Sequence, residues 1–318
     1  MSPRARTYVF VALAAIAASG LLVAAVAFTR TSSPHAQAAQ RQAPTLVLDL
    51  GVRTDREAVA LRRANALYAA GKRPEAGRIF ARYDSVPAEV GAALAGWPDE
   101  TVARLETLAD RHPSSGLVLL HLGLAKVAGG DTAGAQVAWR EALARDPDTE
   151  PAVQAESLLF PRFAPQRPGF VPGFPLPRAI AALPPPRQFA RLARDARGND
   201  VRAKLLYGSA LQRLGRSVSA EREFAAAARL APGDAEAQVA AAVGRFSKAK
   251  PAVAFSRLGP LARRFPHSQS VRFHLGELLI WIGQLKEARR QLNLAVRAGP
   301  TTPLGQTSRE FLRQLPAK

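Results

Sequence analysis

Small, apolar and proline positions recur along this chain with a period of thirty-four residues. One copy of the pattern consists of Gly208, Gly215, Ala220, Phe224, Ala227 and Pro232. The pattern starts again at Ala242 and Gly276, and upstream at Gly123 and, without its closing proline, at Ala64. Self-similarity at a fixed period of this length is typical of repeat architectures.

The spacing within one copy predicts a helical hairpin. Gly208 and Ala220 place small residues on two successive helices, which lets them pack closely, and Gly215 breaks the chain between them. Phe224 follows on the inner face of the second helix, and Pro232 ends that helix because proline cannot continue it. A single hairpin cannot bury both of its faces, so we expect an all-α fold, an α-solenoid in which successive hairpins stack around a concave groove.

These positions resemble the tetratricopeptide repeat (TPR) family, whose thirty-four-residue pattern of small, apolar and proline positions they match. The resemblance covers residues 56–302 and is strongest over 116–149 and 201–302. It implies a scaffold that binds other proteins rather than an enzyme. Together with the apolar N-terminus described below, it indicates a membrane-anchored TPR protein of bacterial type.

Two stretches divide the repeats. We expect TPR-like hairpins over 55–159 and C-terminal repeats over 187–302, followed by a capping helix over 303–318. Between them, residues 160–186 are rich in proline and phenylalanine, a composition incompatible with helix. This insertion is either a functional loop or a segment whose phenylalanines pack back on the solenoid, and we favour the second alternative.

The N-terminal segment predicts a membrane anchor. Residues 8–28 carry no charge and, as a helix, would span roughly 30 Å, the thickness of a bilayer core. The length favours a retained transmembrane helix over a cleaved signal peptide, although Ala36-Gln37-Ala38 could serve as a cleavage site. Arg4 and Arg6 favour a cytoplasmic 1–7 and an extracytoplasmic repeat region, that is, a single-pass protein of the cell membrane. Residues 29–54 read as a linker, with a possible short strand around Leu46–Leu50.

Composition limits the chemistry that the chain can perform. Of its 318 residues 47% are apolar, and it has no cysteine, which excludes disulfides, thiol nucleophiles and cysteine-ligated metals. The five histidines are scattered, and no phosphate-binding loop, nucleophile elbow or His-Glu-x-x-His motif occurs. We therefore expect no enzymatic activity, no metal and no cofactor.

The concave groove is the first candidate site. We expect the first helix of each repeat to line it with an apolar and aromatic strip flanked by basic residues. The candidate groove residues are Arg202, Arg213, Phe246, Phe273, Glu277, Ile280 and Trp281. The hypothesis is a membrane-anchored scaffold or adaptor that binds a protein or peptide partner there, in envelope assembly or secretion. The alternative for each apolar residue is a place in the core.

A basic surface is the second candidate. The formal net charge is +19, and most of the excess positive charge lies in residues 187–318, which contain 24 basic and 9 acidic residues. At helical spacing, one face carries Arg187, Arg191 and Arg194, with Arg197 following. Such a surface could bind anionic lipid headgroups or a cell-envelope polymer. Nucleic acid is an unlikely partner, because it would require the reverse topology.

Overall fold

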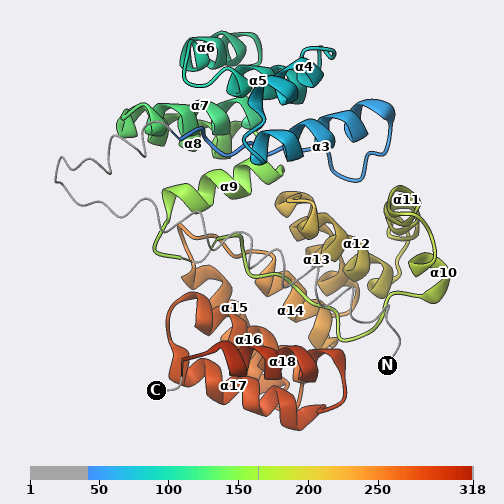
Figure 1. Cartoon of the computed structure of the whole chain (residues 1–318). Helices are drawn as coiled ribbons and strands as arrows, with labels where there is room; N and C mark the ends of the chain where they lie inside the picture. The colour runs from blue at the N-terminus through green and yellow to red at the C-terminus, as the bar shows by residue number, and fades with distance from the viewer. Residues whose placement is uncertain (1–41, 164, 317–318) are drawn as a thin grey trace.

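The computed structural model describes residues 42–163 and 165–316, and this part of the chain is a stack of helices without strands (Figure 1). The N-terminal helices are α3 (Arg56–Ala69), α4 (Arg73–Phe80), α5 (Val86–Ala95), α6 (Thr101–Arg111), α7 (Gly116–Ala128), α8 (Thr132–Arg145) and α9 (Glu150–Leu159). The C-terminal helices are α10 (Arg178–Ala181), α11 (Pro185–Asp195), α12 (Val201–Arg213), α13 (Ser217–Leu230), α14 (Ala235–Val243), α15 (Ala252–Arg264), α16 (Gln269–Trp281), α17 (Leu285–Ala298) and α18 (Pro303–Gln314). The all-α solenoid is confirmed for the described residues, because each helix packs mainly on its neighbours along the chain.

Three hairpins are closed by a glycine packed against a bulky side chain. A Cβ atom added at Gly208 of α12 would overlap the Phe224 ring of α13, and one added at Gly123 would overlap Trp139. A Cβ atom added at Gly276 would likewise overlap the Leu292 side chain. The small positions of the repeat thus allow the two helix backbones to approach while a large side chain fills the space between them.

The turns and helix starts also repeat. At four hairpin turns a glycine, Gly71, Gly130, Gly215 or Gly283, adopts a left-handed backbone, with φ of 71° at Gly215 and 94° at Gly130, where residues with a Cβ are strained. The first helices of the C-terminal repeats begin at N-caps thirty-four residues apart, each accepting a hydrogen bond from the backbone N–H three residues on: Asp200, Asp234, Ser268 and Thr302. Helix start, turn and helix end are therefore all encoded locally.

Polar contacts join the two sets of helices. The carboxylate of Asp148, just before α9, accepts hydrogen bonds from the backbone N–H groups of Val218 and Ser219 at the start of α13 (2.8 and 3.0 Å). Arg216 donates through both terminal nitrogens to the carboxylate of Asp49 (2.7 and 2.8 Å). This bidentate pair is partly buried, and it ties the N-terminal segment to the C-terminal helices.

The segment 160–186 differs from the expectation of a helix-free stretch. Four residues that contain no proline, Arg178–Ala181, form the turn α10, and α11 begins at Pro185, earlier than expected. Proline is compatible with the first turn of a helix because the N–H groups there have no intrahelical acceptor.

The predicted membrane localisation has to be corrected. Among residues 42–163 and 165–316, we find no helix that combines the length and the apolar character needed to cross a bilayer. The predicted span, residues 8–28, lies outside the described residues. The single-pass location is therefore not supported.

The hairpin packing gives a direct test. Gly208→Ala should destabilise the fold by about 1–3 kcal/mol despite the better helix propensity of alanine, because the new methyl group overlaps the Phe224 ring. Gly233→Ala is the matched control, since no atom lies within 4 Å of its added Cβ, and it should change stability by less than about 0.5 kcal/mol. Urea unfolding followed by circular dichroism measures both. Equal stabilities for the two variants would contradict the packing account.

Candidate peptide groove

An extended segment of the chain lies along the first helices of the C-terminal repeats. Residues 168–174 follow α9, run across the C-terminal helices towards α10 and form no regular secondary structure (Figure 1). They contact side chains from α12, α14 and α16. We call the surface that these three helices present to residues 168–174 the C-terminal groove.

The groove holds this segment by its main chain. Four side chains accept hydrogen bonds from four backbone N–H groups: Gly169 to Glu277 Oε1 (3.4 Å), Phe170 to Gln212 Oε1 (3.0 Å), Val171 to His274 Nε2 (2.9 Å) and Gly173 to Glu236 Oε1 (3.0 Å). Pro172, between them, has no N–H to satisfy. Every backbone donor from 169 to 173 therefore has an acceptor on the groove, as burial requires.

Phe170 is the apolar anchor of the segment. Its side chain is 3% exposed, and its ring stacks on His274 with the ring centroids 5.2 Å apart. The edge of Phe224 meets the same ring at 5.4 Å. Since Phe224 also closes the α12–α13 hairpin, the anchor reaches the core of a repeat. The expectation that phenylalanines of the insertion pack back on the solenoid thus agrees with the position of Phe170.

His274 is set up as an acceptor. Its Nδ1 lies 2.7 Å from the carbonyl oxygen of Ser270, one turn earlier, so we assign the ring proton to Nδ1 and leave Nε2 free to accept from Val171. Burial lowers the pKa of His274 to about 4, against the opposing effect of the Ser270 carbonyl. The ring is therefore neutral at physiological pH, as acceptance at Nε2 requires.

Two carboxyl groups in the groove, those of Glu277 and Glu236, lie in surroundings that disfavour their charged forms. Burial raises the pKa of Glu277 to about 8, although the Gly169 N–H favours the charged form, and burial also raises the pKa of Glu236. Among the described residues, the Oε2 atom of each finds no hydrogen-bond partner. Each of these carboxyl groups thus has one oxygen to which the groove's own segment makes no hydrogen bond.

The start of the segment is fixed by an ionic network. Glu156 on α9 is 1% exposed, and its carboxylate accepts from Arg167 Nε (2.6 Å) and from the backbone N–H of Lys248 (3.0 Å). The Lys248 ammonium donates to Ser157 and lies 5.5 Å from the Trp281 ring centroid. Burial lowers the pKa of Lys248 to about 8, with the Glu156 charge opposing. This network holds residue 167 against α9, next to the groove.

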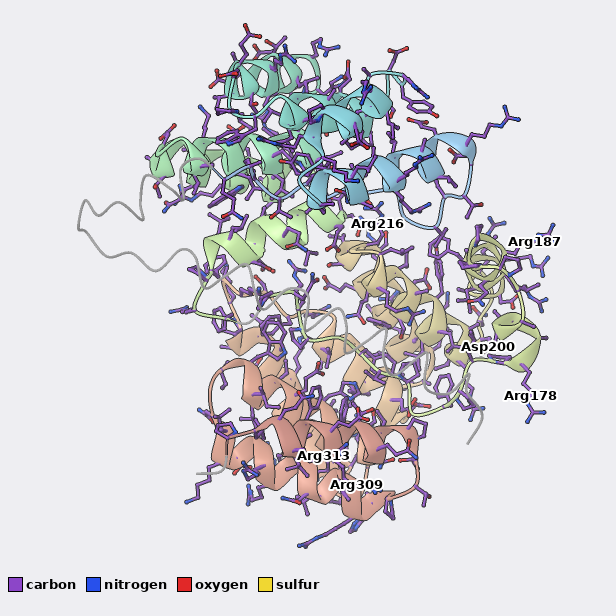
Figure 2. All side chains as sticks on the ribbon, viewed as in Figure 1. Arg178, Arg187, Asp200, Arg216, Arg309 and Arg313 are labelled. Carbon is purple, nitrogen blue, oxygen red and sulfur yellow. The ribbon has the colours of Figure 1, made fainter. Side chains whose placement is uncertain are left out.

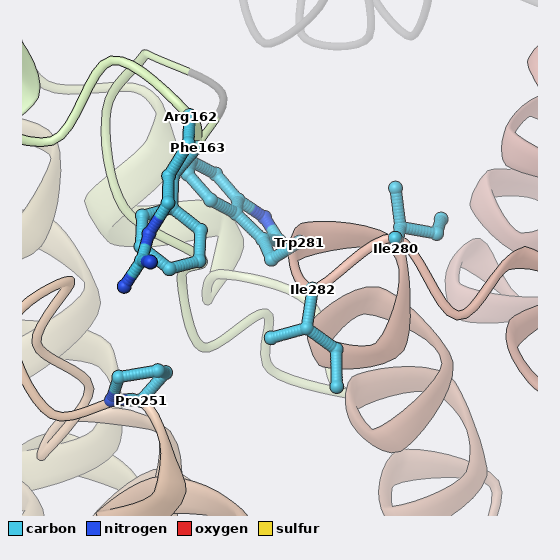
Figure 3. A pocket seen from close by; sticks show the side chains of 7 residues that line it. Arg162, Phe163, Pro251, Ile280, Trp281 and Ile282 are labelled. Atoms are coloured by element: carbon cyan, nitrogen blue, oxygen red, sulfur yellow. The ribbon is translucent and has the colours of Figure 1, made fainter.

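A hollow of about 500 Å³ opens beside this network (Figure 3). Its wall includes two of the predicted groove residues, Ile280 and Trp281 at the end of α16, together with Arg162 and Phe163 of the insertion and Pro251. The predicted residue Trp281 is thus partly accessible, and its ring meets the edge of Phe246 at a centroid distance of 5.9 Å.

The remaining predicted groove residues divide between the groove, the surface and the core. Arg202 is exposed and lies 5.1 Å from the Phe174 ring centroid, so it contacts the segment. Arg213, at the end of α12, is also exposed and is one of the surface residues. Phe246 is 3% exposed, which leaves little of it for a partner. Phe273 differs from the prediction, because it is 1% exposed and its ring stacks on Phe311 of α18 at 5.9 Å. It belongs to the core between α16 and the capping helix.

A second extended segment lies on the N-terminal helices. The backbone N–H of Val47 donates to His121 Nε2 (3.0 Å), and the Tyr68 hydroxyl donates to the carbonyl of Pro44 (2.6 Å). Leu46 and Leu50 are 5% and 4% exposed and belong to the N-terminal core. The structure thus differs from the linker assignment for residues 44–50, because the stacked helices leave an apolar surface that these leucines cover.

The predicted basic surface lies apart from the groove. Arg187, Arg191, Arg194 and Arg197 are all exposed on or just after α11, and Figure 2 shows Arg187 pointing outward, with Arg178 on the neighbouring α10. Arg191 is paired with Asp195 (2.7 Å), which offsets part of the charge. Binding of an anionic polymer there stays a prediction.

Sequence reasoning missed His121, His274 and Glu236 as groove residues. The histidines were considered only as metal ligands, and within the described residues no group of three or more His, Asp or Glu could hold a metal ion. A signal was nevertheless present. Each histidine stands two residues before the small residue of its repeat, Gly123 or Gly276, a position that points away from the hairpin partner.

The two histidines predict an acid sensitivity. The pKa of each is near 6.5 when unfolded and about 4 when folded, because burial disfavours the imidazolium, so the stability they provide is complete above about pH 6.5 and is lost as the pH falls towards 4. Each should contribute roughly 2–3 kcal/mol to the loss between about pH 7 and 4.5. Glu277 acts in the opposite sense, because burial raises its pKa from 4.5 to about 8: its contribution to stability is complete below about pH 4.5 and is lost progressively as the pH rises to about 8.

Urea unfolding at a series of pH values measures this loss. The variant His121→Gln/His274→Gln is the control, because glutamine keeps an acceptor for the valine N–H and does not titrate. Its stability should fall less steeply with acid than that of the parent protein. Parallel curves for the two proteins would assign the acid sensitivity to other groups.

Comparison with protein families agrees with the repeat. The family model described as tetratricopeptide repeat matches residues 117–149, which run from the second residue of α7 through α8 to the residue before α9. None of the curated proteins matches the chain. Similar solved structures include yeast Tom70 (13% identity, TM-score 0.34, covering 89% of this chain and 55% of that one) and the APC/C hetero-tetramer Cut9-Hcn1 (14%, 0.35, 81% and 49%). A third is the complex of the TPR2AB domain of yeast Sti1 with pHSP90 (12%, 0.30, 81% and 96%).

The chain spans about half the length of the first two of these structures. A membrane-anchored, bacterial type gains no support from the comparisons. The ladder of small residues, the hairpin packing and the family match together support a relation to the TPR family, with one matched repeat at residues 117–149 inside a stack of similar helical hairpins.

Proposed function

We propose that this chain is a non-catalytic scaffold of TPR type whose C-terminal groove binds an extended segment of a protein partner. One observation carries the proposal. The groove already binds an extended segment, residues 168–174, through side chains directed at its backbone. The chain thereby shows in cis the contacts that a partner would make in trans.

Main-chain recognition suits this role. Acceptors aimed at backbone N–H groups give affinity to any extended chain, while pockets for alternate side chains give specificity. In this groove Gln212, Glu236 and His274 supply the acceptors, and the site filled by Phe170 supplies an apolar pocket.

The groove's own segment competes with a partner. It is tethered at both ends, so its effective concentration at the groove is of millimolar order, and a free peptide at lower concentration is excluded. A binding test therefore needs a chain whose own segment has been released. Phe170→Asp does this, since it places a charge where a buried aromatic ring packs on His274 and Phe224.

The prediction is that the full chain carrying Phe170→Asp binds a fluorescein-labelled peptide of residues 166–175 saturably, measured by fluorescence anisotropy. The same peptide with aspartate in place of its phenylalanine should bind at least about 10-fold more weakly, because it loses the apolar anchor. Reversing Arg187, Arg191, Arg194 and Arg197 to Glu in this background is the control and should leave binding unchanged. No saturable binding of the peptide would refute the proposed function.

A further inference from the structure

The two extended segments are held in the same way by equivalent histidines. His121 on α7 and His274 on α16 are both fully buried, and in each ring Nδ1 lies 2.7 Å from the carbonyl oxygen of the residue four positions earlier. In each, Nε2 accepts the backbone N–H of a valine, Val47 at 3.0 Å and Val171 at 2.9 Å. The N-terminal and C-terminal halves thus bind an extended chain through the same arrangement of a buried histidine and a valine N–H.

The segments also share a sequence pattern in the same register. The valine that donates to the histidine closes the tetrapeptide Pro44-Thr45-Leu46-Val47 in one case and Pro168-Gly169-Phe170-Val171 in the other. In both, the proline and the large apolar residue are buried, while the second and fourth residues are more exposed. This alternation is that of an extended chain with one face on a surface. The side chains at the first and third positions therefore contact the groove and determine which sequences it can bind.

The second position of the pattern is open. Thr45 is exposed, and a Cβ added at Gly169 would have Gln212 Oε1, at 3.9 Å, as its only neighbour within 4 Å. A side chain therefore fits at this position of the C-terminal groove. A hydroxyl attached to that Cβ would lie within hydrogen-bonding reach of Gln212. Gly173 is different, because a Cβ there would overlap the Glu236 carboxylate.

From this correspondence we propose that the C-terminal groove binds, in exchange for its own residues 168–171, an extended segment of a partner protein with the pattern Pro-x-(Leu/Phe)-Val. The proposal rests on the proposed function and names the chemistry of its partner. The proline fills the first buried position without bringing an N–H, the leucine or phenylalanine takes the place of Phe170, and the valine N–H meets His274. Residues 165–174 then act as the intramolecular occupant that the partner displaces.

The test uses the full chain carrying Phe170→Asp and a labelled peptide of residues 42–51, which contains Pro-Thr-Leu-Val and comes from the other half of the molecule. We expect this peptide to bind the C-terminal groove saturably in anisotropy measurements. The matched control exchanges its threonine and leucine, which keeps composition and charge but moves the apolar residue out of the pocket. This control peptide should bind at least about 10-fold more weakly than the 42–51 peptide.

Variants of the histidine identify the groove that is occupied. In the Phe170→Asp background, His274→Leu removes the acceptor and should weaken binding of the 42–51 peptide about 10-fold, whereas His274→Gln, which keeps an acceptor, should restore most of it. The corresponding His121 variants should have no effect on this binding. If Phe170→Asp does not fold, Val171→Pro releases the segment instead, by deleting the N–H that His274 accepts, without placing a charge in the core.

The outcomes separate the two proposals. If the 166–175 peptide binds but the 42–51 peptide and its exchanged form bind equally well or not at all, the Pro-x-(Leu/Phe)-Val pattern is wrong and the scaffold function stands. If neither peptide binds, the scaffold function itself fails. A concentration-dependent dimer of the released variant, abolished by His274→Leu, would show that the occupant is a second copy of this chain and would overturn the assignment to a separate partner.

Discussion

The structure depends on one constraint: a backbone N–H group that leaves water must find an acceptor. Within helices the ladder meets this requirement, but the two extended segments on the groove surfaces have no ladder. Side chains accept the hydrogen bonds of their backbone N–H groups instead. His121 accepts from Val47, and four side chains on α12, α14 and α16 accept from residues 169–173. The acceptors fix the register of each segment, and the register places Leu46 and Phe170 in the core.

The repeat architecture could be predicted from the sequence because all its determinants are local. The small residue and the bulky residue that pack together, as at Gly208 and Phe224, belong to one hairpin, and each cap lies beside the helix it starts. Where a local signal is missing, the structure changes too. The repeat that begins at Ala242 has Ala249 in place of the turn glycine, and there α14 ends at Val243 and a longer loop carries Lys248 into the ionic network.

The groove was only partly predictable, because its contacts join residues far apart in sequence. Glu277 was predicted as a groove residue and Trp281 lies at the neighbouring hollow, yet nothing periodic indicates that Glu277 would meet Gly169 or that Val171 would meet His274. Helical periodicity also cannot separate a groove face from a core face when a capping helix covers one of them. This explains Phe273, which the packing of α18 places in the core. A sequence pattern shows which residues share a face, but the partner of that face depends on the whole stack.

Both extended segments precede the helices that receive them, which has a consequence during synthesis. Val47 emerges from the ribosome 74 residues before His121, and Val171 emerges 103 residues before His274. At about 5–20 residues per second, the first interval lasts roughly 4–15 s and the second roughly 5–20 s. Throughout that time the backbone N–H of Val47, and later that of Val171, lacks the histidine acceptor that it has in the folded chain. Each extended segment therefore gains its full set of hydrogen bonds only when the helix that carries its histidine has been made.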